Sequence, residues 1–274
     1  MTEMFQQKIP NFQSTLQISH EQTQNIDKLY QCFAIFFDDT TTFPGLQYLK
    51  DCINYFDPII KQERNISPIY TIEGGSALQA NLENIQTLRE MNIRFFGFVW
   101  NGQNTLATGA YTDNTKGLSP IGLECLSLLI SNEIIPDVSH LSEQGFYDIA
   151  SRYNGTIVAT HSNSRQICND LRNLTDEQIQ HIIKVGGLIG LNMHAPFLHK
   201  NSANINDIIR HAYHILQLGG EKALAMGCDF DGTKELPDGI HGAGDMEKVE
   251  AAFLQEFGQT VCENIMYKNA LRIL

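Results

Sequence analysis

Four side chains of the kinds that bind metal ions or transfer protons stand at the ends of apolar, strand-like runs. Glu73 stands next to last in "IYTIEG", His140 closes "IIPDVSH", His161 closes "TIVATH" and Asp229 closes "LAMGCD". Imidazole nitrogens and carboxylate oxygens bind zinc, and zinc with an open position lowers the pKa of a bound water toward neutrality. Asp229 would then take the proton of that water and pass it to a leaving group. The pattern predicts metal-assisted hydrolysis.

Further polar residues at strand ends are candidates for substrate contact. Trp100 and Asn101 follow "IRFFGFV", and His194 follows "LIGLNM". Arg165, four residues beyond His161 in "THSNSR", is suited to hold an anionic group as a bidentate fork, although a surface arginine at a helix start is an equal alternative. One polar residue at a strand end is ordinary because loops begin there. A glutamate, two histidines and an aspartate at four strand ends favour a shared site.

The motif "DFDGT" at 229–233 matches the nucleophile loop of haloacid-dehalogenase-like phosphatases in its letters. In those phosphatases the motif follows the first strand, and the other catalytic elements come later on further strands. Here the chain ends at residue 274, too soon after Asp229 to supply them. The position of the motif therefore excludes the phosphatase interpretation and leaves a metal-site carboxylate or a simple turn.

The elements that would carry these residues alternate regularly along the chain. Apolar strands and amphipathic helices in turn predict an α/β fold with a parallel sheet, either closed as a (β/α)8 TIM-type barrel or open. No Gly-rich phosphate loop follows any strand, and no linker divides the chain, so we expect one domain spanning 1–274. The strands are expected at 30–37, 69–74, 93–100, 134–140, 156–161, 188–193 and 224–229, and the helices at 45–56, 81–91, 120–132, 142–153, 175–187 and 204–220.

Composition narrows the class of protein. A hydrophobic content of 42% with 18% charged residues is typical of a globular domain. A net charge of −12 disfavours binding to nucleic acid or to an anionic membrane surface. No apolar run approaches the roughly 20 residues that span a bilayer. The six cysteines lack CxxC spacing, and no signal-peptide pattern precedes them, which predicts reduced thiols in a cytoplasmic protein.

An ordered set of motifs resembles the membrane (renal) dipeptidase family of zinc metallopeptidases: "IEGG", "VWNGQN", "KGLSPIG", "DVSHLS", "THSNSR", "NLTDEQI", "IGLN", "GCDFDG" and "NALRIL". The resemblance implies an amidohydrolase-type barrel with two zinc ions that hydrolyses dipeptides. It implies metal ligands at Glu73, which bridges the ions, and at His140 and His161. Asp229 would be the acid/base, and Arg165 would clamp the substrate carboxylate. Trp100 replaces a substrate-contacting His of some members, and His194 replaces an aromatic residue.

One departure from the family pattern concerns the first strand, which in the family ends in a His-x-Asp pair of metal ligands. No such pair occurs here, and the start "MTEMFQQ" resembles the segment that comes after that strand, so we expect a barrel lacking its first strand. The remaining ligands suffice for one zinc ion, and a catalytically impaired one-metal relative is the alternative to an active dipeptidase. Lactam or deaminase chemistry at the same residues is a third hypothesis. Exposed sheet edges favour a homo-oligomer.

Overall fold

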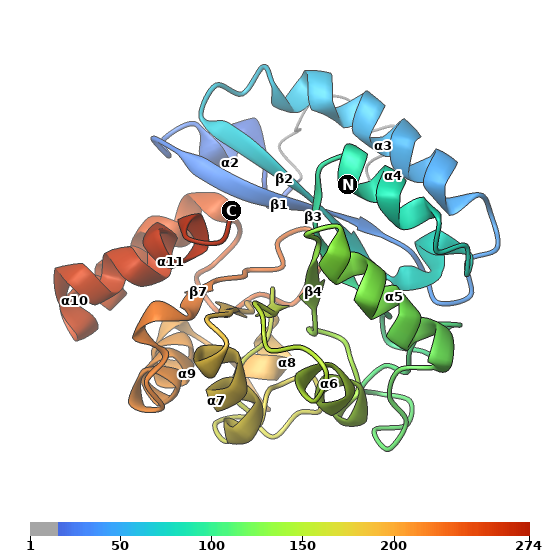
Figure 1. Cartoon of the computed structure of the whole chain (residues 1–274). Coiled ribbons are helices and arrows are strands. Elements are labelled where there is room, and N and C mark those ends of the chain that lie inside the picture. Colours follow the sequence, from blue (N-terminus) through green and yellow to red (C-terminus); the bar gives the residue numbers. More distant parts are fainter. Residues whose placement is uncertain (1–15) are drawn as a thin grey trace. The chain divides into compact units, whose positions relative to one another are not determined.

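The computed structural model describes residues 16–274, which form two compact units (Figure 1). The first unit contains Ile26–Asn154, and the second contains Gly155–Leu274 together with residues 16–25. The start "MTEMFQQ" lies outside the described residues. No helix in the described part is both long enough and apolar enough to cross a membrane. The cytoplasmic location, the single domain and the homo-oligomer stay predictions.

The first unit is built on four parallel strands that pair in chain order. In the register, Glu73 lies opposite Phe36 on one side and Gly97 on the other, and Gly97 lies opposite Asp137. The carboxyl ends of these strands therefore meet at one edge. The elements are β1 (Leu29–Phe36), α3 (Gly45–Ile60), β2 (Ile66–Glu73), the 3-10 helix η1 (Gly75–Leu78), α4 (Asn84–Glu90), β3 (Ile93–Gly97), α5 (Pro120–Ser131), β4 (Ile135–Asp137) and α6 (Glu143–Ala150).

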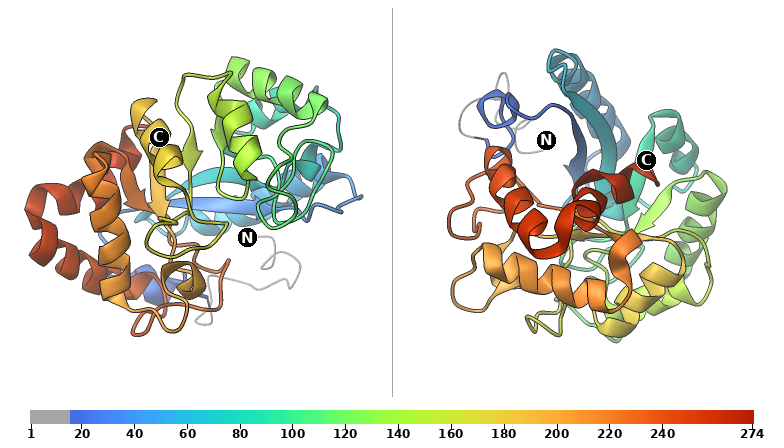
Figure 2. Two further views of the ribbon diagram at one scale, coloured as in Figure 1. Left: turned by 90° about the horizontal axis from the view of Figure 1, so that it is seen from below. Right: turned by 90° about the vertical axis from the view of Figure 1, so that its left-hand side faces the viewer.

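The second unit has three short parallel strands, again paired in chain order, with Ala159 opposite Ile189 and Leu191 opposite Met226. Helices α9 and α10 pack side by side in this unit (Figure 2). The elements are α2 (His20–Thr23), β5 (Val158–Ala159), α7 (Asp176–Lys184), β6 (Leu188–Leu191), α8 (Ala195–Leu198), α9 (Ile205–Gln217), η2 (Gly220–Lys222), β7 (Leu224–Met226), η3 (Ala243–Asp245), α10 (Met246–Glu263), the π-helical η4 (Asn264–Lys268) and α11 (Asn269–Leu271).

Local sequence signals explain where several helices begin. The hydroxyl of Ser142 accepts a hydrogen bond from the backbone of Gly145 and caps α6. Thr175 and Gln178 form a capping box at the start of α7. Strand β6, which follows α7, is apolar on both faces: all four of its residues are buried, as a parallel strand covered by helices requires.

The α/β fold with parallel strands is confirmed, and each expected strand coincides with an observed one. Residues 16–19 form a bend, and Ser19 caps the short helix α2. One longer element differs from the prediction. Helix α10 was not predicted, because few of its residues are buried and Gly258 interrupts it with a left-handed φ of 78°.

Candidate active site

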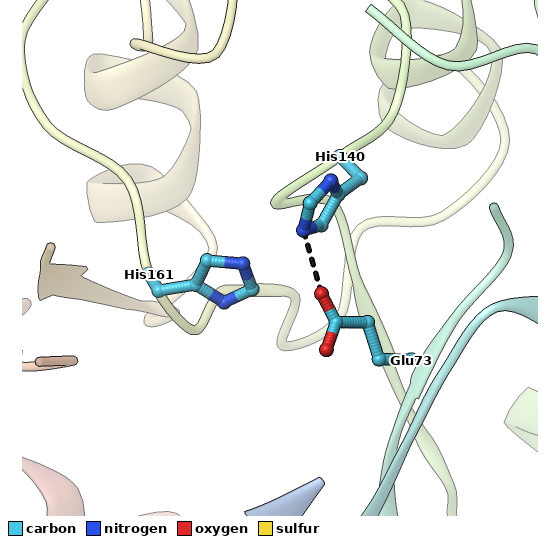
Figure 3. Close-up of side chains that lie close together, drawn as sticks. All are labelled: Glu73, His140 and His161. Atoms are coloured by element: carbon cyan, nitrogen blue, oxygen red, sulfur yellow. Dashed lines mark ion pairs between the residues drawn. The ribbon is translucent and has the colours of Figure 1, made fainter. Parts of the chain in front are cut away.

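The first unit brings Glu73 and His140 into direct contact. The Nε2 atom of His140 lies 2.8 Å from the Oε1 atom of Glu73. Glu73 is the last residue of β2, and His140 follows the end of β4, so the strand register carries both to the same edge. Figure 3 shows the two side chains pointing toward each other, and it also draws His161. The side chain of Glu73 is 21% exposed and that of His140 is 10% exposed, so solvent screens this pair only partly.

Asn101 fixes the orientation of the His140 ring. Its Oδ1 atom lies 3.1 Å from His140 Nδ1. An amide oxygen only accepts hydrogen bonds, so Nδ1 carries the ring proton and Nε2 presents its lone pair to Glu73. A lone pair and a carboxylate at 2.8 Å attract each other only when a cation or an added proton accompanies them. This donor arrangement fits a metal ion, which takes neutral imidazole nitrogen and carboxylate oxygen together.

Trp100 packs beside this pair. Its ring centroid lies 4.9 Å from that of Phe36, in an edge-on contact, and 6.3 Å from that of His140. Asp39 holds the loop that carries Trp100 and Asn101, because its carboxylate accepts hydrogen bonds from the backbone of Trp100 at 2.9 Å and of Gly102 at 2.7 Å. We did not select Asp39 from the sequence. It follows β1 in "FFDDT", where two adjacent aspartates give no indication of which one turns inward.

In the second unit, Asp229 adopts a conformation that few non-glycine residues take. Its φ is 60°, and its carbonyl accepts hydrogen bonds from the backbone of Gly232 and Thr233 at 3.0 and 3.1 Å. A Cβ at position 232 would lie 2.2 Å from Asp229 Oδ1, so the glycine there leaves room for the carboxylate in its observed position. Left-handed non-glycine residues are enriched at active sites. The turn therefore sets the position of Asp229 closely.

The second aspartate of "DFDG" has a different role. The carboxylate of Asp231 accepts hydrogen bonds from the backbone of Gln17 at 2.7 Å and of Ile18 at 3.0 Å. The side chain of Gln17 accepts in return from the backbone of Asp231 at 2.7 Å. Asp231 thus fastens residues 17–18 to the turn, which separates it from Asp229 as a structural carboxylate.

Buried amides connect the segments that follow β5 and β6. Asn163 and the backbone of Asn192 exchange two hydrogen bonds of 3.0 Å each, and both side chains are fully buried. The Nδ2 atom of Asn192 donates to the backbone oxygen of His161 at 3.3 Å and to Asp229 Oδ2 at 3.4 Å. Asn192 therefore links the predicted ligand His161 to the predicted acid/base Asp229.

Two arginines lie in the loop after β5. Arg165, the predicted carboxylate clamp, donates from Nε to the carbonyl of Asn173 at 2.9 Å and from Nη2 to that of Leu171 at 3.1 Å, so part of its guanidinium holds the loop. Arg172 is only 3% exposed, and its guanidinium lies 5.5 Å from the ring of Phe197. We did not select Arg172 from the sequence, because an arginine in "NDLRNL" gives no sign of burial.

A model of the membrane dipeptidase family (peptidase family M19) matches residues 51–274, well over half of the chain. The chain belongs to this family. The resemblance stated from the sequence motifs is thereby confirmed, and with it the prediction of a peptidase from a metal-dependent family.

Relatives of this membrane dipeptidase family member include the uncharacterized protein in the pqqA 5′ region of Klebsiella pneumoniae. It is 28% identical over 262 residues, which cover 91% of this chain and 96% of the relative. A metallopeptidase from Rhodobacter sphaeroides, solved with a phosphinate mimic of the dipeptide L-Ala-D-Ala, superimposes with a TM-score of 0.83 at 22% identity, covering 95% of this chain and 90% of the other. A second solved metallopeptidase, dipeptidase AC, superimposes with a TM-score of 0.84 at 23% sequence identity. The match covers 95% of this chain and 89% of the other. At these identities the solved structures show a shared fold.

Proposed function

We propose that this protein hydrolyses dipeptides with the help of a metal ion, zinc, held by Glu73, His140 and His161. The observation that carries the proposal is the Glu73–His140 pair at 2.8 Å, with Asn101 directing the His140 lone pair toward the carboxylate. Each of the three residues offers one ligand atom, a carboxylate oxygen or a ring nitrogen. Family membership supports the reaction class.

When bound, the ion would supply an activated water and polarise the scissile carbonyl. In the proposed reaction Asp229 accepts a proton from the attacking water as the oxygen bonds to the carbonyl carbon. The carbon–nitrogen bond then breaks, and Asp229 gives the proton to the leaving amine. The turn at 229–233 and the amide of Asn192 hold the carboxylate in one place for both transfers.

An arginine of the loop after β5 would bind the terminal carboxylate of the dipeptide. Arg165 is the residue predicted from the sequence, and Arg172 is the second candidate because its charge is buried against Phe197. Burial strengthens the attraction between a guanidinium and a carboxylate, since less water screens it. Trp100, Asn101 and His194 would complete the contacts to substrate.

The test measures zinc and turnover on one preparation. Purified protein is analysed for bound zinc and assayed against a panel of dipeptides, next to His140→Ala. His241→Ala serves as the matched control, because that histidine is 76% exposed and pairs with Asp245 on the surface. We expect the control to retain zinc and turnover and His140→Ala to lose both. Zinc without turnover in the unaltered protein would instead support the catalytically impaired relative.

A further inference from the structure

Thr233, the last residue of "DFDGT", holds the ring of His194. The hydroxyl oxygen of Thr233 lies 2.7 Å from His194 Nδ1 and also accepts a hydrogen bond from the backbone of Glu235 at 3.2 Å. Thr233 is 8% exposed, so water does not readily replace either bond. Neither the metal ligands nor the acid/base role account for this buried threonine.

The partners of the hydroxyl decide where the ring proton lies. A backbone amide can only donate, so the Glu235 bond occupies one lone pair of Thr233 and leaves its hydroxyl proton to be placed. Within residues 16–274, the acceptor in reach of that proton is His194 Nδ1. Nδ1 therefore carries the lone pair, and the proton of the neutral ring is on Nε2. Burial, the largest effect, lowers the pKa of His194, which favours the neutral ring at neutral pH.

Other contacts fix where the ring sits. The backbone of His194 donates to Asn192 Oδ1 at 2.6 Å, and the ring packs edge-on against Phe197 with centroids 4.5 Å apart. Asn192 also contacts Asp229, and Thr233 closes the turn that begins at Asp229. Two separate connections therefore tie the His194 ring to the proposed acid/base. In the described residues no hydrogen bond engages Nε2, the atom that bears the proton.

We propose that Thr233 is a positioning residue that fixes His194 as an Nε2–H donor to a carbonyl or carboxylate oxygen of the bound substrate. The inference rests on the proposed function for the identity of the substrate as a dipeptide. The position of the ring proton does not depend on the proposed function, because it follows from the contacts of Thr233 alone. A neutral, oriented N–H group favours an oxygen acceptor over an amine, so it would contribute to the orientation of the dipeptide.

The first measurement reads the ring itself. Nitrogen-15 spectra of labelled protein at neutral pH report which nitrogen of His194 carries the proton, with His194→Gln used to assign the signals. We expect protonated Nε2 and an Nδ1 that accepts a hydrogen bond, and we expect Thr233→Val to remove the hydrogen-bond effect at Nδ1. A proton on Nδ1 in the unaltered protein would overturn the proposal, whether or not the protein hydrolyses dipeptides.

The second measurement uses a matched pair of variants on the zinc-loaded protein. The amide nitrogen of Gln reaches the place of Nε2 but gives Thr233 no acceptor, whereas the shorter Asn mimics only Nδ1. His194→Asn and Thr233→Val should each raise KM about fivefold with little change in kcat, as expected for one lost hydrogen bond, and His194→Gln, which keeps the donor without its positioning bond, should raise KM less than His194→Asn. Thr233→Ser should restore the KM of the unaltered protein.

Controls and substrate choice separate the outcomes. Melting temperature and zinc content show whether a variant is folded, and the Gln and Ser variants keep the test open if Thr233→Val is not. Equal KM values across all four variants would overturn the substrate contact. A dipeptide with an amidated carboxyl end distinguishes the acceptor: an unchanged fivefold effect identifies the peptide carbonyl, and a lost effect identifies the carboxylate. If no dipeptide is turned over by the unaltered protein, the proposed function fails, and the spectra still decide the role of Thr233.

Discussion

The two units of this protein present opposite kinds of polar group at the ends of their strands. In the first unit, an imidazole lone pair faces a carboxylate, His140 against Glu73, and Asn101 holds it there. In the second unit, the Asp229 carboxylate is met by a neutral amide donor from Asn192. The contact between His140 and Glu73 is favourable once a cation is added. The contact between Asn192 and Asp229 is favourable without one, because an amide donates to a carboxylate. In the proposed function, the first unit therefore supplies the ligands Glu73 and His140, and the second unit supplies the ligand His161 and the proton-transferring Asp229.

Removal of an ion ligand should produce the largest effect. We expect His140→Ala to lower zinc affinity by more than the roughly 100-fold that loss of an outer-sphere partner can cost, and to abolish turnover. The reason is that Glu73 then lacks its partner nitrogen. Zinc content after dialysis against a weak chelator measures the loss. A variant that keeps stoichiometric zinc would show that His140 is not a metal ligand.

The two aspartates of "DFDG" test the role of the second unit. Asp229→Asn should leave zinc bound and lower kcat by about 10²–10⁴-fold, the usual contribution of a positioned acid/base. Asp231→Asn is the matched control, since its carboxylate holds the backbone of Gln17 and Ile18. That variant should lower the melting temperature and keep the kcat of the folded protein. If the two variants had equal kcat values, the acid/base assignment to Asp229 would be wrong.

Acid should weaken the second unit through His211. This buried ring accepts from the backbone of Ser164 at 3.0 Å and donates to the carbonyl of Leu198 at 3.1 Å, and burial lowers its pKa from 6.5 to about 4. Because the folded pKa is depressed, the neutral ring contributes its full stability above pH 6.5, and that stability is lost as the pH falls toward 4. The loss amounts to about 3 kcal/mol.

Urea unfolding at several pH values between 7 and 4 measures this loss. His211→Asn keeps an acceptor for Ser164 without a titrating ring, so its unfolding free energy should be lower at pH 7 and should change less with pH. Parallel curves for the unaltered protein and the variant would exclude His211 as the source of the acid sensitivity.

The sequence predicted the fold well because its signals are local. Strand β6 is apolar throughout, and the Thr175 capping box marks the start of α7. Each element could therefore be placed without knowledge of the segments that pack against it. The residues Glu73, His140 and Asp229 could be selected because side chains that bind metals or transfer protons recur at the ends of several strands. Asp39, Arg172 and Thr233 were missed because their roles depend on contacts with residues far along the chain, Trp100, Phe197 and His194 respectively. The spacing of residues in the sequence does not reveal such contacts.

The smallest effect that we expect concerns Asn101. It tests whether this residue orients the His140 ring for metal binding. If the amide oxygen holds the ring proton of His140 on Nδ1, Asn101→Ala should reduce zinc affinity by about 10–100-fold, as for other outer partners of metal-binding histidines. Saturating zinc should then restore most of kcat, because His140 and Glu73 remain. Competition with a chromophoric chelator gives the affinity. If zinc affinity stays unchanged while KM rises, Asn101 acts only through contact with the substrate, and other residues set the orientation of His140.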